Sequence, residues 1–252
     1  MTVTLAILSI TLGLVYTSYG IMTIVDMARG WRRYGFSHFG MAWIAMAFTC
    51  GPHHLEHGLH LLSGNRPAGP LELVAVIVGF PAGVIWFLLR VEAMSGGRGD
   101  RVLADSFRPV RWLPYLFGVY GGGFLVATVG VLVRFEQFPP MVASNLTLVV
   151  LYGLIGWYLL RTQLKTHRAS GAWSLSGIAL TIVFPTCALM HAAWAAYQVA
   201  GRYEADVHTV IIDWFAVPAA AYFLWVFRGL YAGTVGDWNE ATDRTEREPA
   251  LV

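Results

Sequence analysis

The sequence predicts an all-α integral membrane protein with seven transmembrane helices. Its 252 residues are 56% hydrophobic and only 13% charged, a composition far from that of a soluble domain. The apolar stretches are also long enough, at about 20 residues, to cross a bilayer as helices, and short polar linkers separate them. The expected spans are residues 3–28, 41–62, 71–93, 112–134, 141–161, 174–199 and 208–230.

An internal repeat appears when the sequence is aligned with itself at an offset of 137 residues. Chance matching between apolar segments is the alternative, but one ungapped offset aligns several rarer residues. Because one span lies between the two copies, both run the same way through the membrane, in a 3+1+3 parallel arrangement. The matched pairs are Ser37 and Ser174, Gly40 and Gly177, Thr49 and Thr186, Cys50 and Cys187, His54 and His191, Gly64 and Gly201, and Pro81-Ala82 and Pro218-Ala219.

The repeat divides the chain into four parts. We expect a three-helix repeat at 1–95 and a second one at 139–232, which contain spans 1–3 and 5–7. A cytoplasmic loop and a linker helix occupy 96–138, and a flexible cytoplasmic tail follows at 233–252.

Orientation is predicted from the basic residues, which are retained on the cytoplasmic side of a membrane. Only Arg66, Arg134 and Arg202 flank one side of the predicted spans, and the other Lys and Arg residues flank the opposite side. The N-terminus is therefore expected outside and the C-terminus in the cytoplasm, in a multi-pass protein of the cell (plasma) membrane. The first span has no basic segment before it, which predicts a retained anchor rather than a cleaved signal peptide.

A cluster of ionisable residues interrupts the second span at "PHHLEHGLH". At 100° per residue these side chains share one helical face. Two later spans add histidines and a carboxylate at a similar depth, and ionisable residues inside a bilayer normally face the bundle interior and serve a function. The candidate metal ligands are His53, His54, Glu56, His57, His60, His191, His208 and Asp213.

The two cysteines leave two interpretations open. Each precedes a histidine by four residues, so Cys50 with His54 and Cys187 with His191 would share a helical face. Two such pairs, facing each other, would suit zinc or copper. Free cysteine is more often a small packing residue, and the sequence favours that role.

Three functions compete on these observations. The first is a metal-dependent redox enzyme with copper, iron or zinc in the outer half of the membrane, acting on a small or lipophilic substrate reached from outside. The second is a haem b electron carrier with His54 and His191 as axial ligands, and the third is a transition-metal transporter. The inner halves of the spans offer almost no polar side chain to a moving cation, which disfavours transport. The bilayer is the expected partner, and the basic loops are explained by topology rather than nucleic-acid binding.

Overall fold

The computed structural model describes residues 1–64, 68–104, 140–202 and 206–235, together with the single residues 115, 118, 122 and 129. Apart from those four residues, the expected linker helix at 112–134 lies outside the described part, as does most of the expected tail. The described ranges contain six long helices and two short strands. Their bounds are α1 (Thr2–Tyr34), α2 (His38–Leu62), α3 (Pro70–Met94), β1 (Val102–Ala104), α5 (Pro140–Ser170), β2 (Ala172–Ser174), α6 (Leu175–Val199) and α7 (Val207–Ala232).

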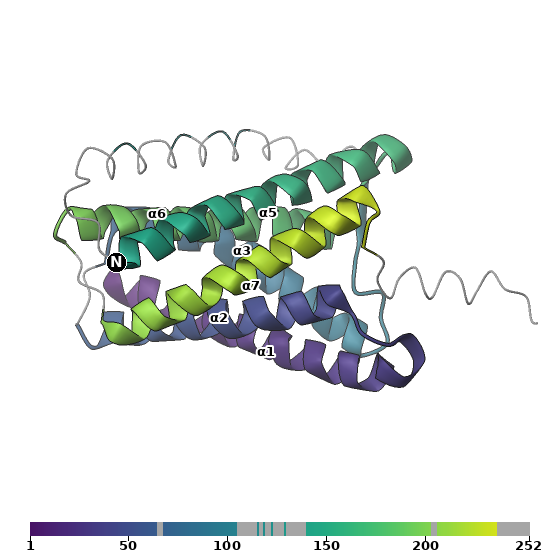
Figure 1. Cartoon of the computed structure of the whole chain (residues 1–252), viewed down its shortest axis with the longest axis horizontal. Helices are drawn as coiled ribbons and strands as arrows, with labels where there is room; N and C mark the ends of the chain where they lie inside the picture. The colour runs from purple at the N-terminus through teal and green to yellow at the C-terminus, as the bar shows by residue number, and fades with distance from the viewer. Residues whose placement is uncertain are drawn as a thin grey trace, which may run out of the picture.

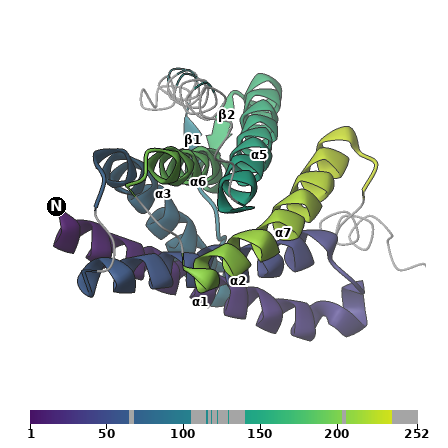
Figure 2. The same cartoon turned by 60° about the vertical axis from the view of Figure 1, so that its left-hand side comes forward.

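The six helices form a closed ring in which each packs against the next, in the order α1, α2, α7, α5, α6, α3 and back to α1. They lie lengthwise along the molecule (Figure 1). Seen from another side, α3, α6 and α5 form one layer, and α1, α2 and α7 form the other (Figure 2). The middle helices of the two layers are α2 and α6, so their inward faces meet the centre of the ring.

The surface of the ring is that of a membrane protein. Five helices, α1, α3, α5, α6 and α7, are long and apolar enough to cross a bilayer. Large apolar side chains are exposed along the outer face of α1, at Ile7, Leu14 and Ile21, each two helical turns from the next. Such extended exposed apolar surface is typical of contact with lipid. The expectation of a helical membrane protein is therefore confirmed.

The α2 helix is not among those five, although its 25 residues would be enough to cross a bilayer. It carries Glu56 and the run of histidines, which lower its hydropathy. Glycines bring it close to α1: a Cβ atom at Gly13 of α1 would lie 2.8 Å from the carbonyl oxygen of Gly51, and one at Gly58 would lie 2.9 Å from that of Ala6. The glycine face of α2 therefore packs on α1, and its opposite face, which carries His53, His57 and His60, turns away from α1.

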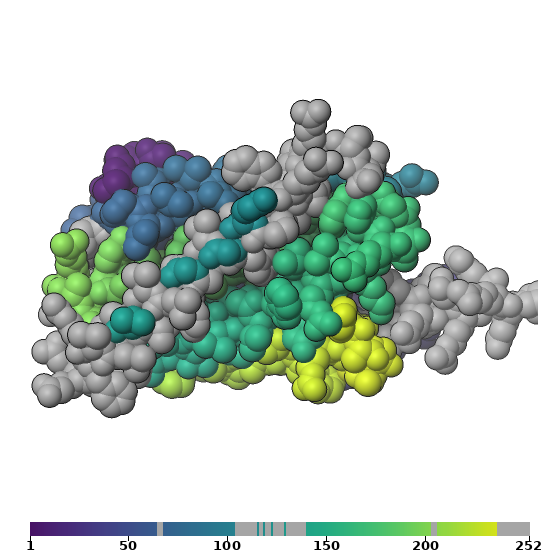
Figure 3. Space-filling view, turned by 90° about the horizontal axis from the view of Figure 1, so that it is seen from above, coloured from purple at the N-terminus to yellow at the C-terminus, as the bar shows by residue number. Residues whose placement is uncertain are grey.

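The two ends of the ring differ in charge. One end, here called the amino-terminal end, contains Met1, the last turns of α2 and α6, and the first turns of α3, α5 and α7. Among the residues that the structure describes, every Lys and Arg except Arg202 lies toward the opposite end or in its loops. There the last turns of α5 and α7 lie side by side (Figure 3). The Tyr231 ring contacts Arg161 at 5.0 Å and Lys165 at 5.4 Å.

An aromatic layer fills the centre of the ring toward the opposite end. Trp43 of α2 is its middle member, with ring-centroid distances of 4.2 Å to Trp86, 4.7 Å to Phe223 and 5.9 Å to Phe184. Tyr19 stacks on Trp86 at 3.4 Å. All five side chains are buried. This aromatic layer, composed of Tyr19, Trp43, Trp86, Phe184 and Phe223, leaves an apolar, packed centre on that side.

A small two-stranded sheet, which the sequence did not predict, joins the loops at the opposite end. Strand β1 pairs antiparallel with β2, and Val102 lies opposite Ser174. Asp100, just before β1, accepts hydrogen bonds from Ser174 Oγ at 2.7 Å and from the Ser176 backbone N–H at 2.8 Å. The loop after α3 is thereby tied to the first turn of α6, where the helix dipole also favours a carboxylate.

We expect the Asp100→Ala variant to be less stable than the wild type by about 1 kcal/mol, the usual cost of removing a capping side chain. Burial raises the pKa of Asp100, but hydrogen bonds from Ser174 and from the backbone of Ser176 and Arg101 lower it, and the net pKa lies below the ordinary 3.8. A carboxyl group with a lowered pKa stabilises the fold above its unfolded pKa and loses that effect as pH falls through its folded pKa. Thermal unfolding in detergent should therefore show a difference at pH 7 that shrinks below about pH 4; a difference that is independent of pH would contradict this role.

Candidate metal centre

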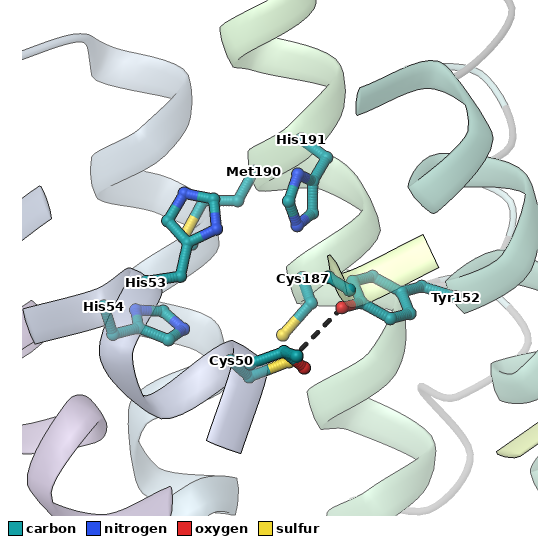
Figure 4. Close-up of a pocket in the computed structure, with 9 residues that line it drawn as sticks. Cys50, His53, His54, Tyr152, Cys187, Met190 and His191 are labelled. Atoms are coloured by element: carbon teal, nitrogen blue, oxygen red, sulfur yellow. Dashed lines mark hydrogen bonds between the residues drawn. The ribbon is translucent and has the colours of Figure 1, made fainter. Parts of the chain in front are cut away.

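A small cavity lies in the centre of the ring, between α2 and α6. Its volume is about 10 Å³, the space of roughly one water molecule. Figure 4 shows the imidazoles of His53, His54 and His191 and the thiols of Cys50 and Cys187 gathered around it. The full lining is Thr49, Cys50, His53, His54, Tyr152, Cys187, Met190, His191 and Ala216.

The two cysteines thus lie at the same cavity, one from each of the two central helices. Both are free thiols. The sulfur of Cys50 lies 3.3 Å from the Tyr152 hydroxyl, within hydrogen-bond range for sulfur. Cys187 also belongs to the hydrophobic core, so the packing role expected from sequence is compatible with this position.

The strongest candidate for a metal site is the group of His53, His191 and Asp213, here called the buried group. One ligand atom from each residue lies within 4.8 Å of the others, and all three side chains are buried. His53 Nδ1 is 3.1 Å from Asp213 Oδ1. Neighbouring ligands around one tetrahedral ion with bonds of about 2.0–2.2 Å lie only slightly farther apart, at about 3.3–3.6 Å. The buried group therefore has approximately the spacing that one ion requires.

Asn145 of α5 orients two members of the buried group. Its Nδ2 donates to Asp213 Oδ2 at 2.8 Å and to the Met141 carbonyl oxygen at 3.0 Å, which directs its Oδ1 toward His191. His191 Nδ1 lies 2.6 Å from that oxygen. Since an amide oxygen only accepts, Nδ1 must carry the proton, and the Nε2 lone pair is left to bind a metal.

Trp194 holds both imidazoles in place. Its ring stacks on His53 with centroids 4.5 Å apart and meets His191 edge-on at 5.1 Å. The tryptophan is 1% exposed, so it also excludes water from this side of the buried group. Electrostatic attraction between the buried group and a cation would be strong there, because little water would screen it.

A second group of candidate ligands lies at the amino-terminal end, between the last turn of α2 and the start of α7. It consists of Glu56, His60 and Asp206, here called the mouth group, whose ligand atoms also lie within 4.8 Å of one another. His60 Nδ1 is 3.4 Å from Asp206 Oδ2 and 3.7 Å from Glu56 Oε1. Unlike the buried group, these side chains are partly exposed.

The structure separates the other predicted site residues. His54 lines the cavity but belongs to neither group, and its ring meets Tyr16 edge-on at 5.5 Å. His57 is buried, with Nε2 4.0 Å from Glu72 Oε2. His208 is exposed on α7 and lies outside both groups. Five of the eight predicted residues therefore fall into two groups, and His54, His57 and His208 belong to neither.

Several residues of the site were not identified from the sequence. Asn145 and Glu72 could have been found as polar residues inside apolar spans, because such residues are costly unless they have a partner. Asp206 caps α7 by accepting from the Thr209 backbone N–H at 2.9 Å. Trp194 and Tyr152 carried no signal, because aromatic residues are common in any membrane span.

No protein-family model matches this chain, and no curated protein and no solved structure matches it. What the protein does is therefore inferred from the geometry of its two ligand groups. Their residues come from helices far apart in the sequence, which makes the convergence informative.

Proposed function

We propose that this protein is an integral membrane metalloprotein that holds one transition-metal ion at His53, His191 and Asp213. The convergence of these three buried side chains within 4.8 Å carries the proposal. The alternative is a polar network without metal. The complete burial of Asp213 favours a cation, since a carboxylate inside a membrane protein is costly unless it meets a positive charge or a hydrogen-bonded partner.

The ligand types indicate which ions would suit the site. Two imidazoles and a carboxylate bind iron, copper or zinc, and the nearby thiols of Cys50 and Cys187 add affinity for softer ions. Haem b between His54 and His191 fits less well, because both residues line a cavity of only about 10 Å³. A macrocycle would have to displace Met190, Tyr152 and both cysteines from it.

We propose redox catalysis rather than transport, because the aromatic layer closes the centre of the described ring on one side of the cavity. The aromatic layer packs the centre of the ring between the cavity and the opposite end. An ion at the buried group would therefore be resident. Polar residues lie instead toward the amino-terminal end, where His57, Glu72 and the mouth group follow. A small or lipophilic substrate would reach the ion from there, and the ion would supply redox or Lewis-acid chemistry.

We also propose the membrane orientation that the basic residues predict, with the N-terminus outside. Positive charge gathers at the end opposite the N-terminus, which supports an outward-facing mouth group in the plasma membrane.

The internal repeat has its own support. The bounds of α2 and α6 differ by the same 137 residues, from His38 to Leu175 and from Leu62 to Val199. Exchanging α1 with α5, α2 with α6 and α3 with α7 also leaves the ring of helix contacts unchanged. Both observations support two parallel copies of a three-helix unit.

Ser37 and Ser174 support the repeat at the level of single hydrogen bonds. Each accepts from the backbone N–H three residues later, Gly40 at 2.8 Å and Gly177 at 3.0 Å, and so caps its helix. A shared cap is a local event that depends on a few residues. The matching caps account for the matching starts of α2 and α6, and they add support for the repeat at the level of single residues.

Metal analysis of the purified protein tests the function. The protein is extracted in detergent without chelators, its metals are measured by mass spectrometry, and its visible and electron paramagnetic resonance spectra are recorded before and after reduction. We expect copper or iron at about one ion per chain at the buried group, with a signal that responds to reductant. Zinc alone would leave the metal site but contradict redox catalysis. Absence of bound metal would overturn the proposal in favour of a hydrogen-bonded polar network.

A further inference from the structure

One side of the buried group faces the cavity between α2 and α6. His53 and His191, two of its three members, line that cavity (Figure 4). Trp194 packs against the same two imidazoles, and Asp213 meets His53 from α7. Neither Trp194 nor Asp213 lines the cavity. A tetrahedral ion with three protein ligands keeps a fourth position for a small molecule, and the cavity is a space into which that position can open.

The volume of the cavity limits the size of a molecule at that position. At about 10 Å³ the cavity has the space of roughly one water molecule. The first atom of a bound molecule would lie at the open position itself, between the ion and the cavity. The cavity then has room for the second atom of a diatomic molecule. A substrate with a ring or an aliphatic chain would have to displace Met190 and Tyr152.

The chemistry of the lining favours an uncharged molecule. The nine described lining residues include no Lys, Arg, Asp or Glu. The Thr49 hydroxyl already donates to carbonyl oxygens of its own helix, and the Tyr152 hydroxyl pairs with Cys50 Sγ. Met190 and Ala216 add a thioether and a methyl group. A charged or strongly hydrated ligand would therefore lose its water here with few hydrogen bonds in return, which is costly.

His54 is the lining residue with hydrogen-bonding capacity to spare. It is 3% exposed, and its Nδ1 has no hydrogen-bond partner among the residues that the structure describes. Its ring meets Tyr16 edge-on, which occupies neither nitrogen. A buried polar atom without a partner costs free energy, so it indicates an occupant of the cavity that the imidazole can bond.

We infer that the cavity is the substrate-binding site of the proposed metal centre and that it takes a neutral diatomic molecule, such as dioxygen, with His54 as its hydrogen-bond partner. The inference rests on the proposed function, because it needs an ion at the buried group. It narrows the substrate class from small or lipophilic molecules to those with two non-hydrogen atoms.

Carbon monoxide is the probe, because it is a neutral diatomic molecule that binds reduced copper or iron and not zinc. The full-length protein in detergent is analysed for metal, reduced and exposed to carbon monoxide with and without isotopic labelling, and infrared difference spectra are recorded. Ala216→Val adds two methyl groups to the cavity wall. Ala219→Val is the matched control, at a buried alanine one turn further along α7 that does not line the cavity. His54→Leu removes the hydrogen bond. The metal content of each variant shows whether its buried group is intact.

The wild type and the Ala219→Val control should give the same carbon monoxide band, which isotopic labelling shifts. Ala216→Val should keep its metal but bind carbon monoxide about 10-fold more weakly, because the added methyl groups occupy the space of the ligand. His54→Leu should keep its metal and give a band at a different frequency.

The opposite outcomes are distinct. A protein with a reducible ion but no band, or an Ala216→Val variant that binds carbon monoxide as tightly as the wild type, overturns the inference and leaves the metal site standing. An unchanged band in His54→Leu overturns the role of His54. A protein without a reducible ion overturns the proposed function, and this inference with it.

Discussion

Replacing His53 or His191 with glutamine is expected to reduce bound metal from about one ion per chain to less than a tenth of that. Each change removes one of three ligands. Replacing a residue that only hydrogen-bonds to a ligand already lowers metal affinity about 10–100-fold, so the loss of a ligand itself should cost at least as much. Glutamine is chosen over alanine because its amide can still form hydrogen bonds, to Asp213 from position 53 and to Asn145 from position 191. The measurement is metal content by mass spectrometry after purification without chelators.

His208→Gln is the matched control, because this exposed histidine lies outside both ligand groups. It should keep the full metal content at the buried group. The His54→Gln variant distinguishes between two possible positions of the ion. If it strips the metal while His53→Gln retains it, the ion lies among Cys50, Cys187 and His54, and the buried group described above is not the ligand set.

Asn145→Leu is expected to weaken metal binding by about 10–100-fold while leaving a site that fills at high metal concentration. The substitution removes the donor to Asp213 Oδ2 and the acceptor that fixes the proton on His191 Nδ1. It also leaves those two polar groups without a hydrogen bond, which should lower stability by about 1–3 kcal/mol. Competition titration with a chelator gives the affinity, and thermal unfolding gives the stability.

Ser144→Ala is the control for that change. Ser144 is the neighbouring buried residue on α5, and its hydroxyl bonds only to the Met141 carbonyl oxygen of its own helix among the contacts described. The control should bind metal with wild-type affinity. Equal affinity of Asn145→Leu and Ser144→Ala would show that Asn145 has no positioning role.

The limits of sequence-based inference are clearest at the histidine cluster. Helical periodicity placed His53, His57 and His60 on one face, and in the structure that face turns away from α1. Periodicity could not show that His53 would meet Asp213 while His60 would meet Asp206. Those partners depend on how α2 and α7 are placed against each other over their length.

The sequence by itself determined the class of the protein and the approximate positions of the six helices that the structure describes, because these depend on local composition and on the length needed to cross a bilayer. It also determined that α2 carries ionisable residues on one face, since the 3.6-residue period is a property of a single helix. Only the tertiary structure decided that His53, His191 and Asp213 form one buried group and that Glu56, His60 and Asp206 form another. It also decided that Asn145 orients His191. These relations join α2, α5, α6 and α7, and contacts between helices depend on their packing and rotation, which no single stretch of sequence specifies.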